Sequence, residues 1–186
     1  MTGTLATPIS ARLRSGEALA DRILRVDHGG EHGAVNIYRA QALICAWRAP
    51  DMVAELHEFQ IHEMGHREVF AAELLRRGVR QGLGYVLLGC GGFLLGLVTG
   101  LLGRAAIAAT THAVERVVLR HLSAQLDYLR DRDEAAYRAV KSILSDEQSH
   151  HDRAAVLVRR GTFWPRLVEP VVAAATEAVI WIGMHR

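Results

Sequence analysis

Residues 63–66 read Glu-Met-Gly-His and residues 147–150 read Glu-Gln-Ser-His, so the pattern Glu-x-x-His occurs twice. A further glutamate precedes each stretch by 32 positions, Glu31 before the first and Glu115 before the second. The two copies of this extended pattern are offset by 84 residues. We therefore interpret the chain as two copies of one helical unit, each with three side chains of the kind that bind metal ions.

Each copy is predicted to fold as a hairpin of two helices. The midpoint between Glu31 and Glu63 lies next to Pro50, which cannot continue a helix. The midpoint of the second copy lies within residues 131–133, Asp-Arg-Asp. Two antiparallel helices of equal length that join at this turn place both glutamates of a copy at the same level along the hairpin. Within Glu-x-x-His, positions i and i+3 share one helix face, so both side chains point at one spot.

Hardly any stretch alternates as a strand does, and the sequence predicts an all-α fold. A Glu from each of two helices and Glu-x-x-His from each of the other two form the ligand set of ferritin-like dinuclear carboxylate proteins. We predict a ferritin-like four-helix bundle of two pseudo-symmetric hairpins, with an apolar crossover helix and a C-terminal apolar helix. The six candidate metal ligands and catalytic residues are Glu31, Glu63, His66, Glu115, Glu147 and His150.

The expected boundaries follow from the positions of Gly, Pro and charged residues. A flexible N-terminus covers residues 1–16, and a single domain covers residues 17–186. Hairpin 1 is expected over about 17–77, the apolar crossover over about 79–104, hairpin 2 over about 105–160 and the C-terminal helix over about 165–184. Gly78 and Gly161 are the expected helix stops in the two hairpins.

Composition excludes some classes of protein. The formal net charge is +2, and no run of Lys or Arg is long enough to predict nucleic-acid binding. Two cysteines, Cys45 and Cys90, are too few for a disulfide framework and indicate reduced thiols. The first sixteen residues lack the hydrophobic centre of a secretory signal.

The segment 82–103 has 22 residues and no charge, which is long enough for a transmembrane helix. A single crossing would place Glu31 and Glu115 on opposite sides of the membrane, so the six ligands could not share a site. We expect instead that this segment and the last helix lie in the membrane interface without crossing it. Gly92, Gly96 and Gly100 would permit close packing in lipid or against a partner. A large buried dimer interface is the alternative.

Four carboxylates and two imidazoles suit iron or manganese better than zinc or Cu(I). Two divalent ions would balance the charge of the four buried acids. Six side chains do not saturate two octahedral ions even when two carboxylates bridge them, so positions remain for O2 or water. A ferrous pair with open positions can reduce O2 by two electrons.

A competing motif overlaps the site. Residues 62–66 match H-E-x-x-H, the zinc-protease helix in which both histidines bind metal and the glutamate is the base. That interpretation leaves Glu31, Glu115, Glu147 and His150 without a role, whereas the repeat accounts for all of them.

Three further residues are candidates for orienting the ligands. Asp146 and His62 directly precede the two repeated glutamates, so Asp146 could hold His66 and His62 could hold His150. Asp27 lies one turn before Glu31 on the same face. Six further histidines are expected to be exposed or to cap helices: His28, His32, His57, His112, His151 and His185.

The stretch 25–34, Arg-Val-Asp-His-Gly-Gly-Glu-His-Gly-Ala, followed by Ile37, Tyr38 and Gln41, resembles the first-helix signature of the demethoxyubiquinone hydroxylases. Residues 113–115 with His121 and Gln125, and residues 146–152, resemble the signatures of its second half. The resemblance covers about residues 20–186 and fills all six ligand positions. Two positions depart from the family pattern, because His32 and Leu122 stand where tyrosine is usual. Leu122 lies on the ligand face and is expected to line the approach to the metals.

The resemblance implies a di-iron monooxygenase of ubiquinone biosynthesis that hydroxylates the ring of a demethoxyubiquinol-type intermediate. It implies two Fe ions per chain, O2 as co-substrate and NADH or the quinol as electron source. The implied partners are a polyprenyl quinone, a membrane surface and a lipid-binding accessory protein. A second copy of the chain is a further candidate partner, and the charge predicts no nucleic-acid partner. The implied location is peripheral, on the cytoplasmic face of a bacterial inner membrane or the matrix face of the mitochondrial inner membrane.

Other functions remain open from the ligand set alone. A non-catalytic iron-binding or membrane-anchored ferritin-like protein would use the same six side chains. An iron-storage protein needs a hollow assembly with a polar interior, which the apolar segment 82–103 disfavours. A rubrerythrin-like peroxidase usually carries an extra four-thiolate iron site, which two cysteines cannot build.

Overall fold

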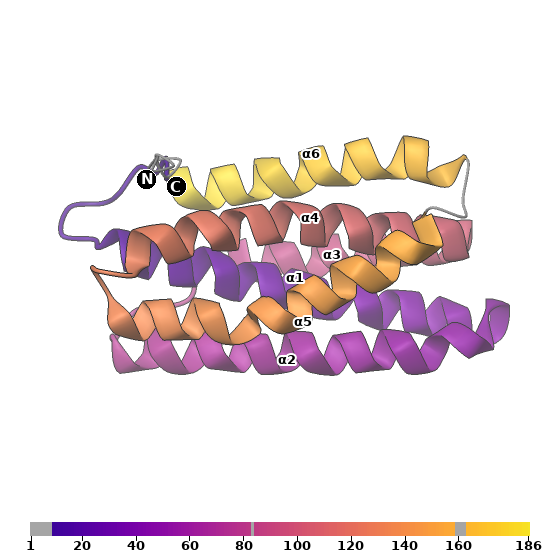
Figure 1. The fold of residues 1–186 in the computed structure, drawn as a ribbon, viewed down its shortest axis with the longest axis horizontal. Coiled ribbons are helices and arrows are strands. Elements are labelled where there is room, and N and C mark those ends of the chain that lie inside the picture. Colours follow the sequence, from indigo (N-terminus) through magenta and orange to yellow (C-terminus); the bar gives the residue numbers. More distant parts are fainter. Residues whose placement is uncertain (1–8, 83, 159–162) are drawn as a thin grey trace, which may run out of the picture.

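The computed structural model describes residues 9–82, 84–158 and 163–186. Within them the chain forms six α-helices and one short 3-10 helix, and no strand. The elements are α1 (Leu19–Arg48), η1 (Pro50–Met52), α2 (Val53–Arg76), α3 (Gly84–Leu102), α4 (Arg104–Leu129), α5 (Glu134–Val158) and α6 (Trp164–His185). The predicted all-α bundle is confirmed (Figure 1). The two-fold relation between the hairpins stays a prediction.

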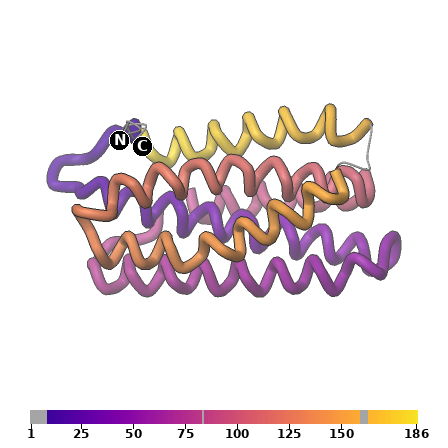
Figure 2. The backbone as a smooth tube through the Cα atoms, in the orientation of Figure 1, coloured from indigo at the N-terminus to yellow at the C-terminus, as the bar shows by residue number. Residues whose placement is uncertain are grey.

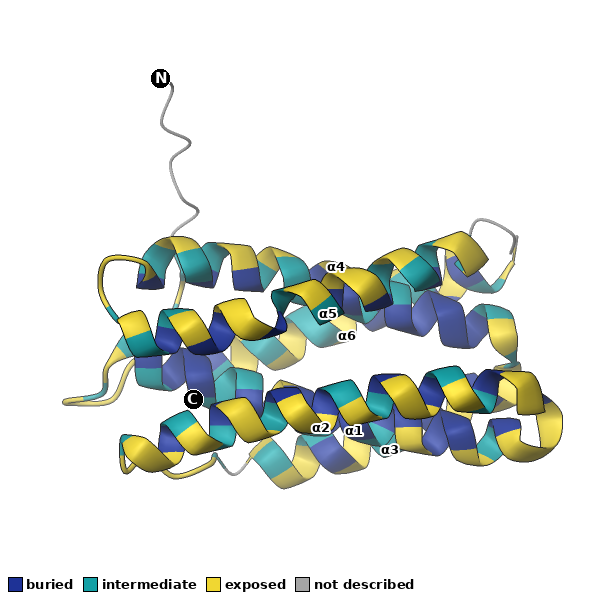
Figure 3. Ribbon diagram, turned by 60° about the horizontal axis from the view of Figure 1, so that its bottom comes forward, coloured by how far each residue is buried: buried dark blue, intermediate teal, exposed yellow. Residues whose placement is uncertain are grey.

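Helices α1 and α2 pack as one antiparallel pair, and α4 and α5 as another. Helix α3 packs along α1 and runs the length of the bundle to connect the two pairs, so α2 and α4 run in the same direction (Figure 2). Buried residues lie on the facing sides of these helices (Figure 3). Two of the three left-handed glycines among the described residues mark sharp turns between helices: Gly78 (φ 66°) after α2, as predicted, and Gly103 (φ 94°) between α3 and α4. The predicted stop at Gly161 lies outside the described residues.

Helix α3 lies along α1 because its glycines have no side chain. A Cβ at Gly92 would collide with the carbonyl oxygen of Gly33, and a Cβ at Gly96 with that of Ile37. The buried hydrogen bond from Gln41 Nε2 to Thr99 Oγ1 (2.9 Å) adds a polar link between the two helices. The expectation that these glycines meet lipid or a partner is therefore wrong, because they pack against the same chain.

Helix α6 packs on α4 through small side chains. Ala106, Ala109 and Ala113 are buried along one stripe of α4 and contact Val168 and Val172 of α6. Alanine leaves room for the two helix axes to approach closely.

The described part of the predicted N-terminal segment, residues 9–16, contacts the end of α6. The backbone N–H of Arg12 donates to the carbonyl oxygen of Met184 (3.0 Å). The buried Arg22 guanidinium donates to the carbonyl oxygens of Gly183 and Met184 (both 3.1 Å) and pairs with Glu17. These contacts fix the C-terminus of α6 beside the start of α1. Residues 1–8 of that prediction lie outside the described residues.

Helices α3 and α6 are long and apolar enough to cross a membrane, by length and composition alone. Only 28% of the most apolar window of α3 and 17% of that of α6 is buried, although both pack on the bundle. The exposed apolar side chains form what we call the apolar face, which includes Val86, Leu94, Val98, Leu101, Leu167, Val171, Trp181 and Ile182. The apolar face is the part of the fold that a soluble monomer would not be expected to expose.

Candidate metal centre

Four helices bring the six predicted ligands to one place in the bundle. Glu31 comes from α1, Glu63 and His66 from α2, Glu115 from α4, and Glu147 and His150 from α5. All six side chains are buried. Because each Glu-x-x-His spans one helical turn, its carboxylate and imidazole point to the same side of the helix.

The six residues form two overlapping clusters of four. Within each cluster, every residue offers one potential ligand atom, and these four atoms all lie within 4.8 Å of one another. One cluster is Glu31, Glu63, His66 and Glu147, and the other is Glu63, Glu115, Glu147 and His150. Each cluster takes three residues from one hairpin and one glutamate from the other. Glu63 and Glu147 belong to both clusters, as is expected of carboxylates that are shared by two ions.

The two histidines present the same ring atom to the carboxylates. His66 Nδ1 lies 3.0 Å from Glu147 Oε1, and His150 Nδ1 lies 3.1 Å from Glu63 Oε1. Although these pairs are close, Glu63 Oε1, Glu147 Oε1 and His150 Nδ1 are buried and lack hydrogen-bond geometry to any of the described residues. Buried polar atoms normally make hydrogen bonds, so ligand atoms that converge without making them fit shared cations. The residues present therefore fit two divalent ions.

The outer ring nitrogens are held by the residues that the repeat predicted. His66 Nε2 lies 3.1 Å from Asp146 Oδ2, and His150 Nε2 lies 3.1 Å from His62 Nδ1. Both contacts join one hairpin to the other. A partner on the outer nitrogen fixes the ring orientation and directs the inner nitrogen at the metal position.

Electrostatics also favour a cation at this site. Burial raises the pKa of Glu31 and of Glu115 well above the usual value, and neighbouring carboxylates add to the effect. Burial also acts to raise the pKa of Glu63, but His150 and His66 outweigh it and lower this pKa to about 2. Burial disfavours the charged form of His66, yet Glu147 and Glu63 raise its pKa to about 10. The protein alone thus balances buried carboxylates with protons, which metal ions can replace.

The structure adds one contact that the sequence pattern did not predict. The Tyr38 hydroxyl on α1 donates to Glu115 Oε1 on α4 (2.8 Å), and this tyrosine is buried. The spacing of seven residues from Glu31 places Tyr38 two turns further along the same face, a signal that could have found it. Tyr38 fixes the orientation of a glutamate that belongs to only one cluster.

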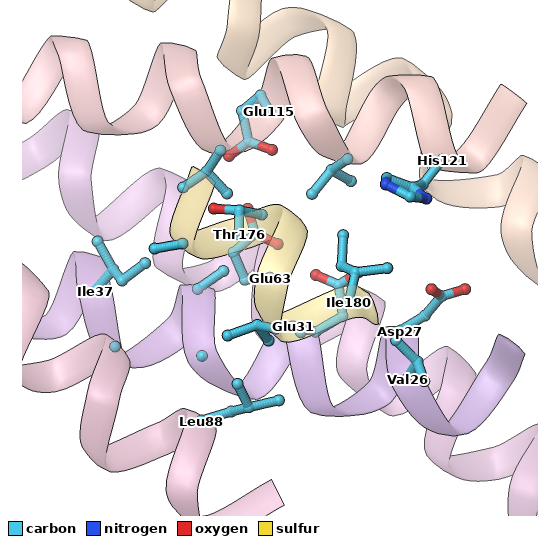
Figure 4. Close-up of a pocket in the computed structure, with 18 of the residues that line it drawn as sticks. Val26, Asp27, Glu31, Ile37, Glu63, Leu88, Glu115, His121, Thr176 and Ile180 are labelled. Atoms are coloured by element: carbon cyan, nitrogen blue, oxygen red, sulfur yellow. The ribbon is translucent and has the colours of Figure 1, made fainter. Parts of the chain in front are cut away.

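An apolar cavity of about 460 Å³ leads to the clusters from the side of α3 and α6. Its wall includes Glu31, Glu63, Glu115 and Glu147, with Leu88, Leu95, Val118, Leu122, Val172 and Ile180 among its apolar residues. Figure 4 shows Glu31, Glu63 and Glu115 on this cavity, with Leu88 and Ile180 from the two apolar helices. The prediction that Leu122 lines the approach is confirmed. An apolar molecule could therefore reach the carboxylates without crossing the polar surface.

The protease interpretation does not fit the geometry. His62, which that motif needs as a ligand, belongs to neither cluster among the described residues and instead contacts the outer nitrogen of His150. The protease motif also needs Glu63 as a base that does not bind metal, whereas Glu63 belongs to both clusters of potential ligands.

The prediction for the other histidines is wrong at His28, which is 6% exposed. Its ring stacks on Tyr85 at a centroid distance of 4.8 Å, and His32 stacks on the same ring at 3.9 Å. The side chain of His32, where tyrosine is usual in the resembled family, therefore lies against a tyrosine from α3. The pairing was not predictable because it depends on where α3 lies against α1.

A helical bundle that directs this set of glutamates and histidines inward from four helices is a ferritin-like protein with a candidate two-metal carboxylate site. The profile of the family described as "Ubiquinone biosynthesis protein COQ7" matches residues 18–183. The chain belongs to this family.

The chain is 32% identical over 167 residues to the 3-demethoxyubiquinol 3-hydroxylase of Rhodospirillum rubrum, covering 89% of this chain and 78% of that protein. It is 34% identical over 143 residues to the mitochondrial 5-demethoxyubiquinone hydroxylase of Saccharomyces cerevisiae, covering 73% of this chain and 61% of that protein. It is 32% identical over 139 residues to the human mitochondrial NADPH-dependent 3-demethoxyubiquinone 3-hydroxylase, covering 73% and 63%.

Proposed function

We propose that this chain hydroxylates the ring of a demethoxyubiquinol-type intermediate of ubiquinone biosynthesis, with O2 as oxidant. The observation that carries the proposal is the connection between the two carboxylate clusters and the apolar cavity beneath α3 and α6. A site for two metal ions supports redox chemistry, and an apolar route to it suits a substrate with a polyprenyl tail. The names of the relatives agree with this substrate class.

Two Fe ions would be held by Glu31 and His66 on one side, by Glu115 and His150 on the other, and by Glu63 and Glu147 between them. Such a pair supplies two-electron reduction of O2 when bound. The overall reaction takes a ring C–H bond, O2, two electrons and two protons to a ring C–OH bond and water. NADH or the quinol itself would supply the electrons.

The protein side chains would position the reactants and exclude water. Asp146 and His62 would fix the two imidazoles, and Tyr38 would hold Glu115. The apolar wall around Val118 and Leu122 would keep bulk water from the reacting ring. A dry site strengthens the interaction of the carboxylates with the metal ions and limits side reactions.

The apolar face supports peripheral attachment to a membrane, with α3 and α6 in the interface. The six ligands converge only if both hairpins lie on the same side of the bilayer, which no single crossing between them allows. The polyprenyl tail would then leave the cavity between α3 and α6 into lipid. A bacterial inner membrane, or the mitochondrial inner membrane in a eukaryote, is the proposed location. The family resemblance further implies a lipid-binding accessory protein, and the apolar face could also receive a second copy of the chain.

The test is turnover in a reconstituted system. The iron-loaded chain, in vesicles that contain a demethoxyubiquinol and an electron donor, is exposed to ¹⁸O2 and the quinone products are analysed by mass spectrometry. We expect one labelled oxygen in a new ring hydroxyl, and none with Glu63→Ala. Bound iron without labelled quinol would instead identify a non-catalytic iron protein, and one zinc per chain with peptide hydrolysis would support the protease motif.

A further inference from the structure

The cavity wall carries few polar groups besides the candidate ligands. Among the described residues these are Asp27, His121, Gln125 and Thr176. The Thr176 hydroxyl donates to the carbonyl oxygen of Val172 on its own helix (2.9 Å), and His121 Nε2 lies 3.0 Å from Glu177 Oε2. Asp27 and Gln125 differ from them, because each keeps one buried oxygen that is not hydrogen-bonded.

Asp27 and Gln125 form a pair across the cavity. Gln125 Nε2 on α4 donates to Asp27 Oδ1 on α1 at 2.9 Å. The second oxygen of each group, Asp27 Oδ2 and Gln125 Oε1, is buried and has no hydrogen-bond partner among the described residues. The Gln125 residue is only 5% exposed. Buried polar atoms in native proteins are normally satisfied, so two buried oxygens without a partner, on two residues that line the cavity, fit a polar ligand there.

The pair can offer both a donor and an acceptor. Burial raises the pKa of Asp27 to about 7, against the hydrogen bond from Gln125 and with the help of the Glu147 charge. A protonated Asp27 donates through Oδ2 while Oδ1 accepts from Gln125, and Gln125 Oε1 accepts. A phenolic hydroxyl donates and accepts one hydrogen bond at the same time, so it matches the pair.

The position of the pair suits a ring that reacts at the clusters. Asp27 lies one helical turn before Glu31, a rise of about 6 Å along α1. Figure 4 shows Asp27 at the same end of the cavity as His121 and away from Glu115. A ring anchored here by one oxygen would extend toward the carboxylates.

We propose that Asp27 and Gln125 bind a ring hydroxyl of the quinol substrate, with Asp27 as donor and Gln125 as acceptor, and so determine which ring carbon faces the metal centre. This inference rests on the proposed function and assigns the recognition of the ring to two residues outside the metal ligands. An apolar wall alone could hold a tail and a ring but would not select the rotation of the ring.

The test measures binding without turnover. The iron-loaded chain is kept under nitrogen, and equilibrium dialysis gives its Kd for a short-tail demethoxyubiquinol and for the dimethyl ether of the same compound. The ether keeps the ring and the tail but cannot donate a hydrogen bond. We expect the wild-type chain to prefer the quinol by about 3–10-fold, the range expected for a hydrogen bond in a protein.

Four variants test which residues bind the quinol hydroxyl. Gln125→Leu should abolish the preference, because Gln125 Oε1 accepts the hydrogen bond that only the quinol can donate. Asp27→Leu should weaken binding of the quinol and of the ether alike, because both keep an oxygen that accepts from Asp27. Asp27→Asn should bind both compounds as the wild type does, because an amide N–H replaces the acid O–H as donor. Gln41→Leu is the matched control, since it also removes a buried hydrogen bond between helices (Gln41 Nε2 to Thr99 Oγ1) but Gln41 is absent from the cavity wall. It should keep the preference. Helical circular dichroism and iron content check that each variant folds.

The outcomes separate this inference from the proposed function. Equal binding of quinol and ether by the wild-type chain would overturn the inference alone, and this comparison does not depend on any variant folding. An unchanged preference in Gln125→Leu together with unchanged affinity in Asp27→Leu would do the same and would assign the two oxygens to bound water. A loss of affinity in Asp27→Asn as large as that in Asp27→Leu would overturn the role of Asp27 as a donor. If the wild-type chain bound neither compound, both the proposed function and this inference would be wrong.

Discussion

His66 and Asp146 belong to different hairpins and are 80 residues apart in the chain, yet His66 Nε2 lies 3.1 Å from Asp146 Oδ2. The contact joins α2 to α5 beside the candidate metal centre. It leaves Nδ1 of the imidazole facing Glu63 and Glu147. The geometry of the clusters and the packing of the hairpins therefore depend on each other.

Replacing Asp146 by Asn should weaken metal binding. The amide removes the charge that holds the His66 ring, and loss of such a partner typically costs about 10–100-fold in metal affinity or activity. Competition with a chelator of known affinity measures the effect. Asp127→Asn, at an exposed position on α4, is the control and should bind metal as the wild type does. Equal affinity in Asp146→Asn would show that the ring is held by packing alone.

The overlap of the clusters predicts different metal contents for two glutamate variants. Glu31 belongs to one cluster, so Glu31→Ala should leave the cluster of Glu63, Glu115, Glu147 and His150 able to bind about one ion. Glu63 belongs to both, so Glu63→Ala should bind almost none. Elemental analysis after dialysis gives the ratio of metal to protein. The same ratio in both variants would contradict the assignment of Glu63 as a bridge.

Metal affinity should fall as the pH is lowered. The pKa values of Glu31 and Glu115 are raised well above normal in the protein alone, so both groups hold protons that metal binding must displace. Binding should therefore release protons below these raised pKa values, and acidification should oppose it. Calorimetry in buffers of different ionisation enthalpy counts the protons released. Binding without proton release would indicate that these carboxyl groups are already ionised.

The apolar face should mediate binding to liposomes. Leu94 and Val98 of α3 are 63% and 47% exposed, and changing both to Gln removes apolar area that lipid would cover. Flotation of vesicles should show weaker binding, with the iron content unchanged. Ile61→Gln with Leu75→Gln is the matched control, because these residues are also exposed but lie on α2.

The orientation of the membrane-bound chain offers an independent check. Probes attached near the turn at Pro50 and near the turn at Asp131 should be accessible from the same side of sealed vesicles. Accessibility from opposite sides would mean that the chain spans the bilayer between the hairpins, and the shared metal site would then have to be abandoned.

The sequence by itself determined the bundle and the identity of the six inward-facing residues. Helical periodicity places Glu63 with His66 and Glu147 with His150 on one face each, and the equal spacing around Pro50 and residues 131–133 sets their depth. The contacts of Asp146 and His62 could also be predicted, because they follow from applying the same repeat to the neighbouring positions.

The tertiary structure decided what depends on the lateral placement of helices. The glycines of α3 pack against Gly33 and Ile37 of the same chain, although their spacing fits a partner helix equally well. The sharing of Glu63 and Glu147, the cavity beneath α3 and α6 and the pair of Asp27 with Gln125 arise only when four helices meet. The physical reason is that the period of a helix specifies which way a side chain points along its own axis, whereas packing between helices specifies what it meets there.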